Sequence, residues 1–370
     1  MSAIAVAAAV VCATIAVWAG QQEPPEPRTR AAAPVRSPQP APPPPADFVP
    51  YVSAWSETGY DMTAAAGRGV KEFTLGFVVA GDGCAPVWDG GTTLDDPALA
   101  ARIEEVRRAG GEVRVSFGGA DGTELSTVCT DVSELAAAYT EVIERYQLTK
   151  ADFDIEGDSL TDPAAATRRA QAIALLQRTH EGLDVSFTLP AMPDGLTAAS
   201  TAQLEAAKDE GVTVSAVNIM AMNYSGGHTG DMGDYAIRAA TAAQARVRGV
   251  LGLSDEAAWK ALGVTPMIGL NNVSGEVFTL EDAAGLARFA AEKGIGRLSM
   301  WSAERDRPCG GERDGGAADE AQEGTASDAA SDAASDPAVA PGSERPETAP
   351  ENRCSGITQR PGAFEAVLRG

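Results

Sequence analysis

Histidine is scarce in this sequence, and basic side chains are outnumbered by acidic ones. The 370 residues contain two histidines, His180 and His228, and 52 acidic against 29 basic side chains, for a formal net charge of -23. Two histidines exclude a histidine-rich metal centre and leave little room for a Ser-His-Asp triad, so we expect neither a metal nor another cofactor. The acidic balance argues against nucleic acid as the main partner. We therefore expect a neutral substrate and carboxylate chemistry.

Composition divides the chain into segments. Residues 1–20 are almost entirely apolar and end in small residues, which is typical of a signal peptide. No Lys or Arg precedes this run and its length approaches a membrane span, so a retained anchor is the alternative. Residues 21–47 predict a Pro-rich linker. Residues 48–370 should form the folded domain, with a disordered acidic insertion at 312–353. We expect a secreted monomer that contacts a membrane only if anchored.

Cysteine is also rare, with five residues in the chain. Cys12 lies in the apolar N-terminal segment, which leaves Cys84, Cys129, Cys309 and Cys354 for the exported part. An even number of cysteines in an oxidising compartment predicts two disulfides. Three pairings are possible, and we favour Cys84 with Cys129 and Cys309 with Cys354 because the second pair brackets the acidic insertion.

Short β-rich runs alternate with longer stretches of helical period, which indicates βα units and a parallel sheet. The eight expected strands are Phe48–Trp55, Glu72–Val79, Glu112–Phe117, Ala151–Glu156, Asp184–Leu189, Val214–Met222, Val264–Leu270 and Arg297–Trp301. Eight repeats over this length predict an α/β fold of the (β/α)₈ TIM barrel type. A doubly wound open sheet is the alternative, but no Gly-rich phosphate-binding sequence opens any helix.

One expected strand carries three acids with alternate spacing. Asp152, Asp154 and Glu156 point to one face of the strand, whereas Phe153 and Ile155 point to the other. A solvated edge strand or a calcium site would also explain such acids. An interior barrel strand is covered on both faces, however, so acids there must be hydrogen-bonded, partly protonated or functional. Crowding keeps a carboxylic acid protonated near neutral pH, so Glu156 would donate a proton to a leaving oxygen.

These residues resemble a known family. Ser116-Phe117-Gly118-Gly119 and Asp152-Phe153-Asp154-Ile155-Glu156-Gly157, in this order, resemble the glycoside hydrolase family 18 chitinases of the archaeal type, which also occur in bacteria. The resemblance implies that Glu156 is the general acid/base, that Asp154 positions the N-acetyl group of the sugar, and that Asp152 shares a proton beneath it. Tyr224 would hydrogen-bond the acetamido oxygen that attacks. The implied reaction cuts chitin or N-acetylglucosamine oligosaccharides with retention, through an oxazolinium intermediate.

Further residues at the strand ends are candidates for substrate binding. Trp301 would lie beneath the sugar at the cleavage point, Met222 would pack against it, and Trp55 would stack on a neighbouring sugar. The pair Asn271-Asn272 would contact sugar hydroxyls, and Ser116 would bind substrate or hydrogen-bond to the Asp152 cluster. Each also has a structural alternative, since a core aromatic residue or a loop Asn is common.

Two departures from the family pattern and two alternative functions remain. Thr149 and Ser225 occupy positions where the wider family often carries Asp. An endo-β-N-acetylglucosaminidase acting on N-glycans would use the same acids, so the catalytic residues do not separate it from a chitinase. A non-catalytic, lectin-like chitin-binding barrel is the second alternative; such members typically lose the donor, whereas Glu156 is present.

Overall fold

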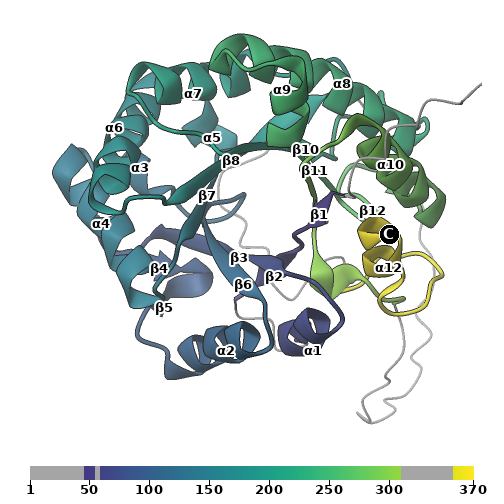
Figure 1. Cartoon of the computed structure of the whole chain (residues 1–370), viewed down its shortest axis with the longest axis horizontal. Coiled ribbons are helices and arrows are strands. Elements are labelled where there is room, and N and C mark those ends of the chain that lie inside the picture. Colours follow the sequence, from purple (N-terminus) through teal and green to yellow (C-terminus); the bar gives the residue numbers. More distant parts are fainter. Residues whose placement is uncertain (1–45, 55–58, 310–352) are drawn as a thin grey trace, which may run out of the picture. The chain divides into compact units, whose positions relative to one another are not determined.

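The computed structural model describes residues 46–54, 59–309 and 353–370. In these residues strands and helices alternate, and Figure 1 shows the helices arranged around a ring of strands. The expected segment 1–20, residues 21–45 of the expected linker 21–47, and the insertion up to residue 352 lie outside the described residues, whereas Asp47 already belongs to the first strand. None of the helices in the described ranges is long and apolar enough to span a membrane.

Parallel strands form the barrel wall. Its strands are β1 (Asp47–Phe48), β2 (Tyr51–Ser53), β3 (Glu72–Ala80), β6 (Glu112–Gly118), β7 (Lys150–Asp154), β8 (Asp184–Met192), β10 (Ala216–Ala221), β11 (Leu262–Pro266) and β14 (Arg297–Leu298). They pair in the order β1-β14-β11-β10-β8-β7-β6-β3, and β2 pairs with β3. The backbone N–H of Val49 donates to Leu298 O at 2.8 Å, and that of Thr74 to Pro50 O at 3.0 Å. The first strand, interrupted at Pro50, therefore closes the sheet, and the predicted TIM barrel is confirmed.

Helices cover the outside of the barrel. They are α1 (Met62–Gly67), α2 (Pro97–Arg108), α3 (Leu125–Val128), α4 (Val132–Arg145), α5 (Gly157–Leu160), α6 (Pro163–Thr179), α7 (Ala198–Asp209), α8 (Met232–Leu251), α9 (Asp255–Ala261), α10 (Leu280–Lys293) and α12 (Ala363–Arg369), with 3₁₀ turns η1 (Asp89–Gly91) and η2 (Ala303–Arg305). An Asp N-cap before a first-turn Pro starts both α2 and α6. Left-handed Gly252 and Gly294 end α8 and α10. Local capping chemistry thus sets where the long helices start and stop.

Alternation along β6, β7 and β8 separates an aromatic face from a polar face. Phe117, Phe153 and Phe187 stand side by side in the register, with ring centroids 5.2 and 5.9 Å apart. Tyr139 of α4 packs against Phe117 at 4.9 Å, so this face points to the helices. Because successive side chains point to opposite sides, the intervening acids and hydroxyls point to the barrel axis.

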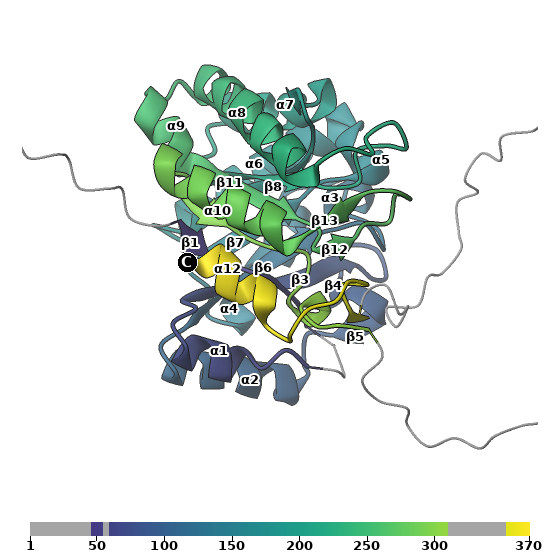
Figure 2. The ribbon, with the colours of Figure 1, turned by 90° about the vertical axis from the view of Figure 1, so that its right-hand side faces the viewer.

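Short antiparallel elements were not anticipated by the sequence analysis. They are β4 (Pro86–Trp88), β5 (Thr92–Thr93), β9 (Gly195–Leu196), β12 (Gly269–Leu270) and β13 (Val277–Phe278). Figure 2 shows β4, β5, β12, β13 and the short helix α5 at one end of the barrel, opposite β1 and the C-terminus. These elements follow the C-terminal ends of the strands, where the active site of a barrel is built.

Both expected disulfides are present. Cys84 pairs with Cys129 and Cys309 pairs with Cys354, each across 45 residues of sequence. The first links the β3–β4 connection to the end of α3, and the second joins the two ends of the undescribed segment 310–352. The favoured pairing is therefore confirmed.

Candidate active site

The three acids rise in a column from β7. Asp152 pairs in register with Ser116 of β6 and Ser186 of β8, and Asp154 pairs with Gly118 and Thr188. The strand ends at Asp154, two residues earlier than expected. Glu156 is the N-cap of α5, yet its backbone remains extended, at φ -145° and ψ -178°. The alternation that places the acids on one side therefore continues to Glu156.

Asp152 is the deepest acid and is enclosed by hydroxyl groups. Ser116 Oγ and Tyr51 Oη donate to Oδ2 at 2.8 and 3.0 Å, and Ser186 Oγ donates to Oδ1. Thr188 Oγ1 lies 3.1 and 3.0 Å from the two carboxyl oxygens. Such a cage fixes the orientation of the carboxyl group and satisfies it without water.

Asp154 lies above it and is 4% exposed. Its Oδ1 has no hydrogen-bond partner among the described residues. Burial raises the pKa of Asp154 well above its ordinary value, and the nearby charges of Glu156 and Asp152 raise it further. Buried oxygens without partners are rare in folded proteins, so Oδ1 is a candidate to bind substrate.

Glu156 tops the column on the wall of a cavity. Burial, followed by the charge of Asp121, raises the pKa of Glu156 to about 7. A carboxylic acid with such a pKa is substantially protonated near neutral pH and can act as a general acid. Because Asp154 and Glu156 interact strongly, their protons belong to the pair rather than to either residue.

The cavity above the column has a volume of about 390 Å³. Its wall includes four predicted residues, Asp154, Glu156, Met222 and Trp301. The Trp301 ring stacks on Phe77 at 5.6 Å and meets the edge of Tyr51 at 5.9 Å. A flat indole supported from behind is suited to the apolar face of a pyranose. This volume lies within the usual range for small-molecule sites.

Sequence reasoning missed part of the wall. The missed residues include Tyr51, Phe77, Asp89, Asp121, Thr188, Thr197, Asn223 and Glu304. Polar residues at alternate positions of the expected strand Asp184–Leu189 were a signal for Ser186 and Thr188, since such residues point into the barrel. Glu304 Oε1 accepts the backbone N–H of Ser53 at 2.9 Å, and its buried Oε2 has no partner among the described residues.

Tyr224 lies beside the cavity but is not part of its wall. Its ring contacts Tyr235 and His228, and its backbone N–H donates to Glu276 Oε2 at 3.1 Å. The hydroxyl is buried and has no hydrogen-bond partner in the described part of the chain. The neighbouring Met222 and Asn223 line the cavity. The catalytic role of Tyr224 stays a prediction.

Two residues expected to contact substrate lie off the cavity wall, Ser116 with its expected hydrogen bond to Asp152, and a third is not described. Ser116 is 0% exposed and donates to Asp152, so it supports the acid column and does not line the cavity. Asn271 Nδ2 donates to the carbonyls of Met267 and Gly269, so its amide holds a turn and Asn272 lines the cavity instead. Trp55 lies outside the described residues. The described ranges contain no cluster of three or more His, Cys, Asp or Glu placed to hold a metal ion.

Comparisons with known proteins agree with this geometry. No family model matches the chain. A probable bifunctional chitinase/lysozyme from Escherichia coli (strain K12) is 35% identical over 280 residues, which are 71% of this chain and 31% of that protein. Endochitinase 11 from Metarhizium anisopliae is 34% identical over 278 residues, which are 70% of this chain and 52% of that protein. The chain thus spans about a third and about half of the length of these curated relatives.

A solved structure covers more of the chain. It contains catalytic site mutants of active domain 2 of a thermostable chitinase from Pyrococcus furiosus, complexed with chito-oligosaccharides. The two are 30% identical with a TM-score of 0.70, over 88% of this chain and 94% of that one. The similarity therefore extends over the whole catalytic domain of that structure.

Proposed function

The chain belongs to the glycoside hydrolase family 18 chitinases, and from this premise we propose that it hydrolyses β-1,4 linkages of chitin or chito-oligosaccharides with retention of anomeric configuration. The observation that carries the proposal is the column Asp152–Asp154–Glu156, whose outermost acid lies on the cavity wall with its pKa raised to about 7. The Pyrococcus furiosus structure with bound chito-oligosaccharides supports this class of substrate.

In the first step Glu156 protonates the glycosidic oxygen as the bond to C1 breaks. The acetamido oxygen of the same sugar attacks C1 and forms an oxazolinium ion, so no protein nucleophile is needed. Asp154 Oδ1, which is buried and has no partner among the described residues, would accept the acetamido N–H and hold the group in line. Trp301, stacked on Phe77, would form the floor beneath this sugar.

In the second step the ionised Glu156 takes a proton from water as the water attacks C1. Two displacements at one carbon return the original configuration. Glu156 thereby regains its proton, which requires a pKa near the working pH. The raised pKa of Glu156 supports both halves of this cycle.

Incubation of the protein with chito-tetraose to chito-hexaose, followed by chromatography and early ¹H NMR of the products, tests the proposal. We expect shorter oligosaccharides whose new reducing end is first formed as the β-anomer. Initial formation of the α-anomer would contradict the retaining mechanism. Release of glycan from a glycoprotein without cleavage of chito-oligosaccharides would favour an endo-β-N-acetylglucosaminidase, and binding without turnover would favour a lectin-like barrel.

We also propose that the protein is exported and acts as a monomer. Its two disulfides support export, since such bonds persist in oxidising compartments. Expression of the full chain in a secreting host, with mass spectrometry of the mature N-terminus and size-exclusion chromatography, tests both points. Cleavage near residue 20 and elution as a monomer are expected; full-length protein in the membrane fraction would favour an anchor.

A further inference from the structure

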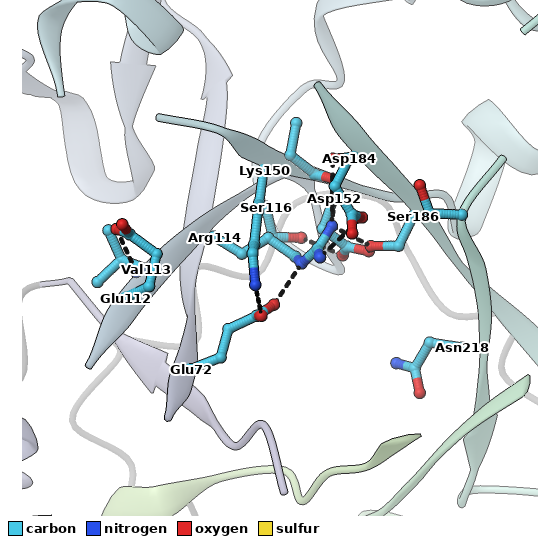
Figure 3. A network of polar contacts seen from close by, with 12 residues as sticks. Glu72, Glu112, Val113, Arg114, Ser116, Lys150, Asp152, Asp184, Ser186 and Asn218 are labelled. Atoms are coloured by element: carbon cyan, nitrogen blue, oxygen red, sulfur yellow. Dashed lines mark hydrogen bonds and ion pairs between the residues drawn. The ribbon is translucent and has the colours of Figure 1, made fainter. Parts of the chain in front are cut away.

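A buried ion cluster lies beneath the acid column. Figure 3 shows Arg114 of β6 between Glu72, Asp184 and Ser186, with its side chain 1% exposed. Its Nε donates to Glu72 Oε1 and its Nη2 to Asp184 Oδ1, both at 2.9 Å. Its Nη1 donates to the carbonyl of Ala151 at 2.8 Å and to Ser186 Oγ at 3.1 Å. The guanidinium therefore connects the ion cluster to a hydroxyl of the column.

Ser186 passes this interaction on to Asp152. Arginine carries only donors, so Ser186 Oγ must accept from Arg114. The single hydroxyl proton of Ser186 is then free to go to Asp152 Oδ1, which lies within hydrogen-bond distance. Asp152 Oδ1 accepts this proton. Arg114 cannot lose its charge, so it fixes the direction of this series of hydrogen bonds from Arg114 through Ser186 to Asp152.

The other neighbours of Asp152 have the same polarity. Asn218 Nδ2 donates to Thr188 Oγ1 at 3.1 Å, which leaves the Thr188 proton for Tyr51 Oη at 2.8 Å or for Asp152. Burial raises the pKa of Tyr51 well above its ordinary value, so its hydroxyl stays protonated and donates to Oδ2. Ser116 donates to the same oxygen. If Asp152 were protonated, its own proton would point at a group that already donates a hydrogen bond to the carboxyl group.

Charge balance gives the same result. The charged or titratable groups facing Asp152 come from β2, β3, β6, β7, β8 and β14, and they are Tyr51, Glu72, Arg114, Lys150, Asp154, Asp184 and Arg297. Three of these are cations, and Glu72 and Asp184 are anions beside them. An ionised Asp152 supplies the third negative charge. With Asp154 protonated, these groups sum to zero charge only when Asp152 has lost its proton.

We propose that Arg114, acting through Ser186, is a positioning residue that keeps Asp152 anionic and accepting, so that the exchangeable proton of the column stays on Asp154 and Glu156. This inference rests on the proposed function of those two acids. It refines the expectation that Asp152 shares a proton, because the structure assigns that proton to the upper part of the column.

Removing the link should let Asp152 compete for the proton. A neutral Asp152 would no longer raise the pKa of Asp154 by its charge, so Asp154 would lose its proton more readily, and its anion beside Glu156 would raise the pKa of the donor. For Ser186→Ala we expect kcat to fall roughly tenfold, which matches the loss of one hydrogen bond to a charged group. KM should change little, and the basic limb of the kcat/KM profile should move to higher pH.

Matched variants separate this effect from a structural one. Ser186→Thr keeps a hydroxyl and should restore the wild-type profile. Ser200→Ala removes another buried hydroxyl, which donates to the carbonyl of Pro190 at 2.7 Å, and should leave the profile unchanged. If the Arg114→Met protein folds, the basic limb of its kcat/KM profile should shift further than that of Ser186→Ala. An unshifted basic limb in Ser186→Ala would overturn the proposal.

A direct readout distinguishes this inference from the proposed function. Carboxyl ¹³C NMR of aspartate-labelled protein, assigned with Asp152→Asn, follows ionisation of Asp152 without any substrate. In the wild type we expect Asp152 to remain ionised between about pH 5 and 8, and in Ser186→Ala to take up a proton within that range. A protonated Asp152 in the wild type would refute the inference even if hydrolysis is observed, whereas absent hydrolysis with an ionised Asp152 would refute only the proposed function.

Discussion

Burial is the main reason that Asp154 and Glu156, the two upper acids of the column, hold protons. Asp154 and Glu156 have their pKa raised first by desolvation and then by neighbouring carboxylates. Asp121 is the neighbour that acts on Glu156, and it lines the same cavity. The acid that donates the proton is therefore tuned by a residue from the loop after β6.

The pH dependence of activity should report this tuning. Glu156 must be protonated to donate, so kcat/KM should fall as pH rises through about 7. Asp121→Asn removes a negative charge that favours the protonated form, and the basic limb should move to lower pH. Asp158→Asn removes an exposed carboxylate two residues from Glu156 and serves as the control. If the basic limb of the kcat/KM profile does not move in Asp121→Asn, the Asp121 carboxylate has no influence on the pKa of Glu156.

The sequence was sufficient to place the three acids on one side of a strand, because alternation is a local property. It was not sufficient to find Arg114 or Ser186 beneath Asp152. Their contacts depend on which strands are neighbours and on the register between them, as in the pairs Ser116–Asp152 and Asp152–Ser186. The contacts of the Asn271 amide were not predictable for a similar reason, since it binds carbonyls of a turn that forms only in the fold.

The ends of strands β6 and β7 approach each other closely at Gly118 and Asp154. Gly118 ends β6 with φ +104°, and a Cβ there would run into the backbone oxygen of Asp154. The same oxygen accepts the backbone N–H of Gly119 at 3.1 Å. The absence of a side chain at Gly118 therefore lets the end of β7 take the position that presents Asp154.

Substitution at this glycine should damage both stability and activity. Gly118→Ala adds a backbone clash to the strain of a positive φ, and we expect the free energy of unfolding to fall by more than about 2 kcal/mol. Gly182→Ala is the matched control, because Gly182 has φ +80° with no heavy atom near its Cβ position. It should lose about 1 kcal/mol and keep full activity. Equal losses in the two variants, measured by urea denaturation, would rule out the close approach as the cause.

Long elements were predictable and short ones were not. Strands such as β3 and β8, and helices such as α6 and α8, are long enough to show a period of two or 3.6 residues. The hairpin β12–β13 has two residues in each strand and carries no such signal. Its position is set by pairing, for example Gly269 with Phe278.

A disulfide between Cys309 and Cys354 attaches the C-terminal segment to the barrel. Cys309 and Cys354 have Cα atoms 5.1 Å apart, so their disulfide holds the two flanks of the insertion together. Arg353, beside it, lines the cavity, and its carbonyl accepts from Arg307 Nε at 2.7 Å. The C-terminal segment thus contributes to the site although it is distant in sequence.

Removal of the insertion should be tolerated. The composition of residues 312–353 predicts disorder, and the disulfide already constrains the ends of this segment. Arg353 is described and lines the cavity, so the deletion is limited to residues 312–352. A short Gly-Ser linker in place of these residues should leave Tm and kcat/KM nearly unchanged, as measured by calorimetry and oligosaccharide hydrolysis. The same deletion with Cys309→Ser and Cys354→Ser should lower Tm, which identifies the disulfide as the stabilising element. A large loss of Tm with the disulfide intact would mean that the insertion packs on the barrel.

The central claim is that Glu156 supplies the proton for cleavage, and Glu156→Gln tests it most directly. Chito-hexaose hydrolysis and binding, the latter by calorimetry, should be measured on one preparation, with exposed Glu141→Gln on α4 as the control. We expect kcat/KM of Glu156→Gln to fall by at least about 10³-fold with Kd nearly unchanged. Because the raised pKa of Glu156 makes its ionisation costly to the fold above about pH 7, the variant should be no less stable there than the wild type. Retained hydrolysis by folded Glu156→Gln would contradict the account.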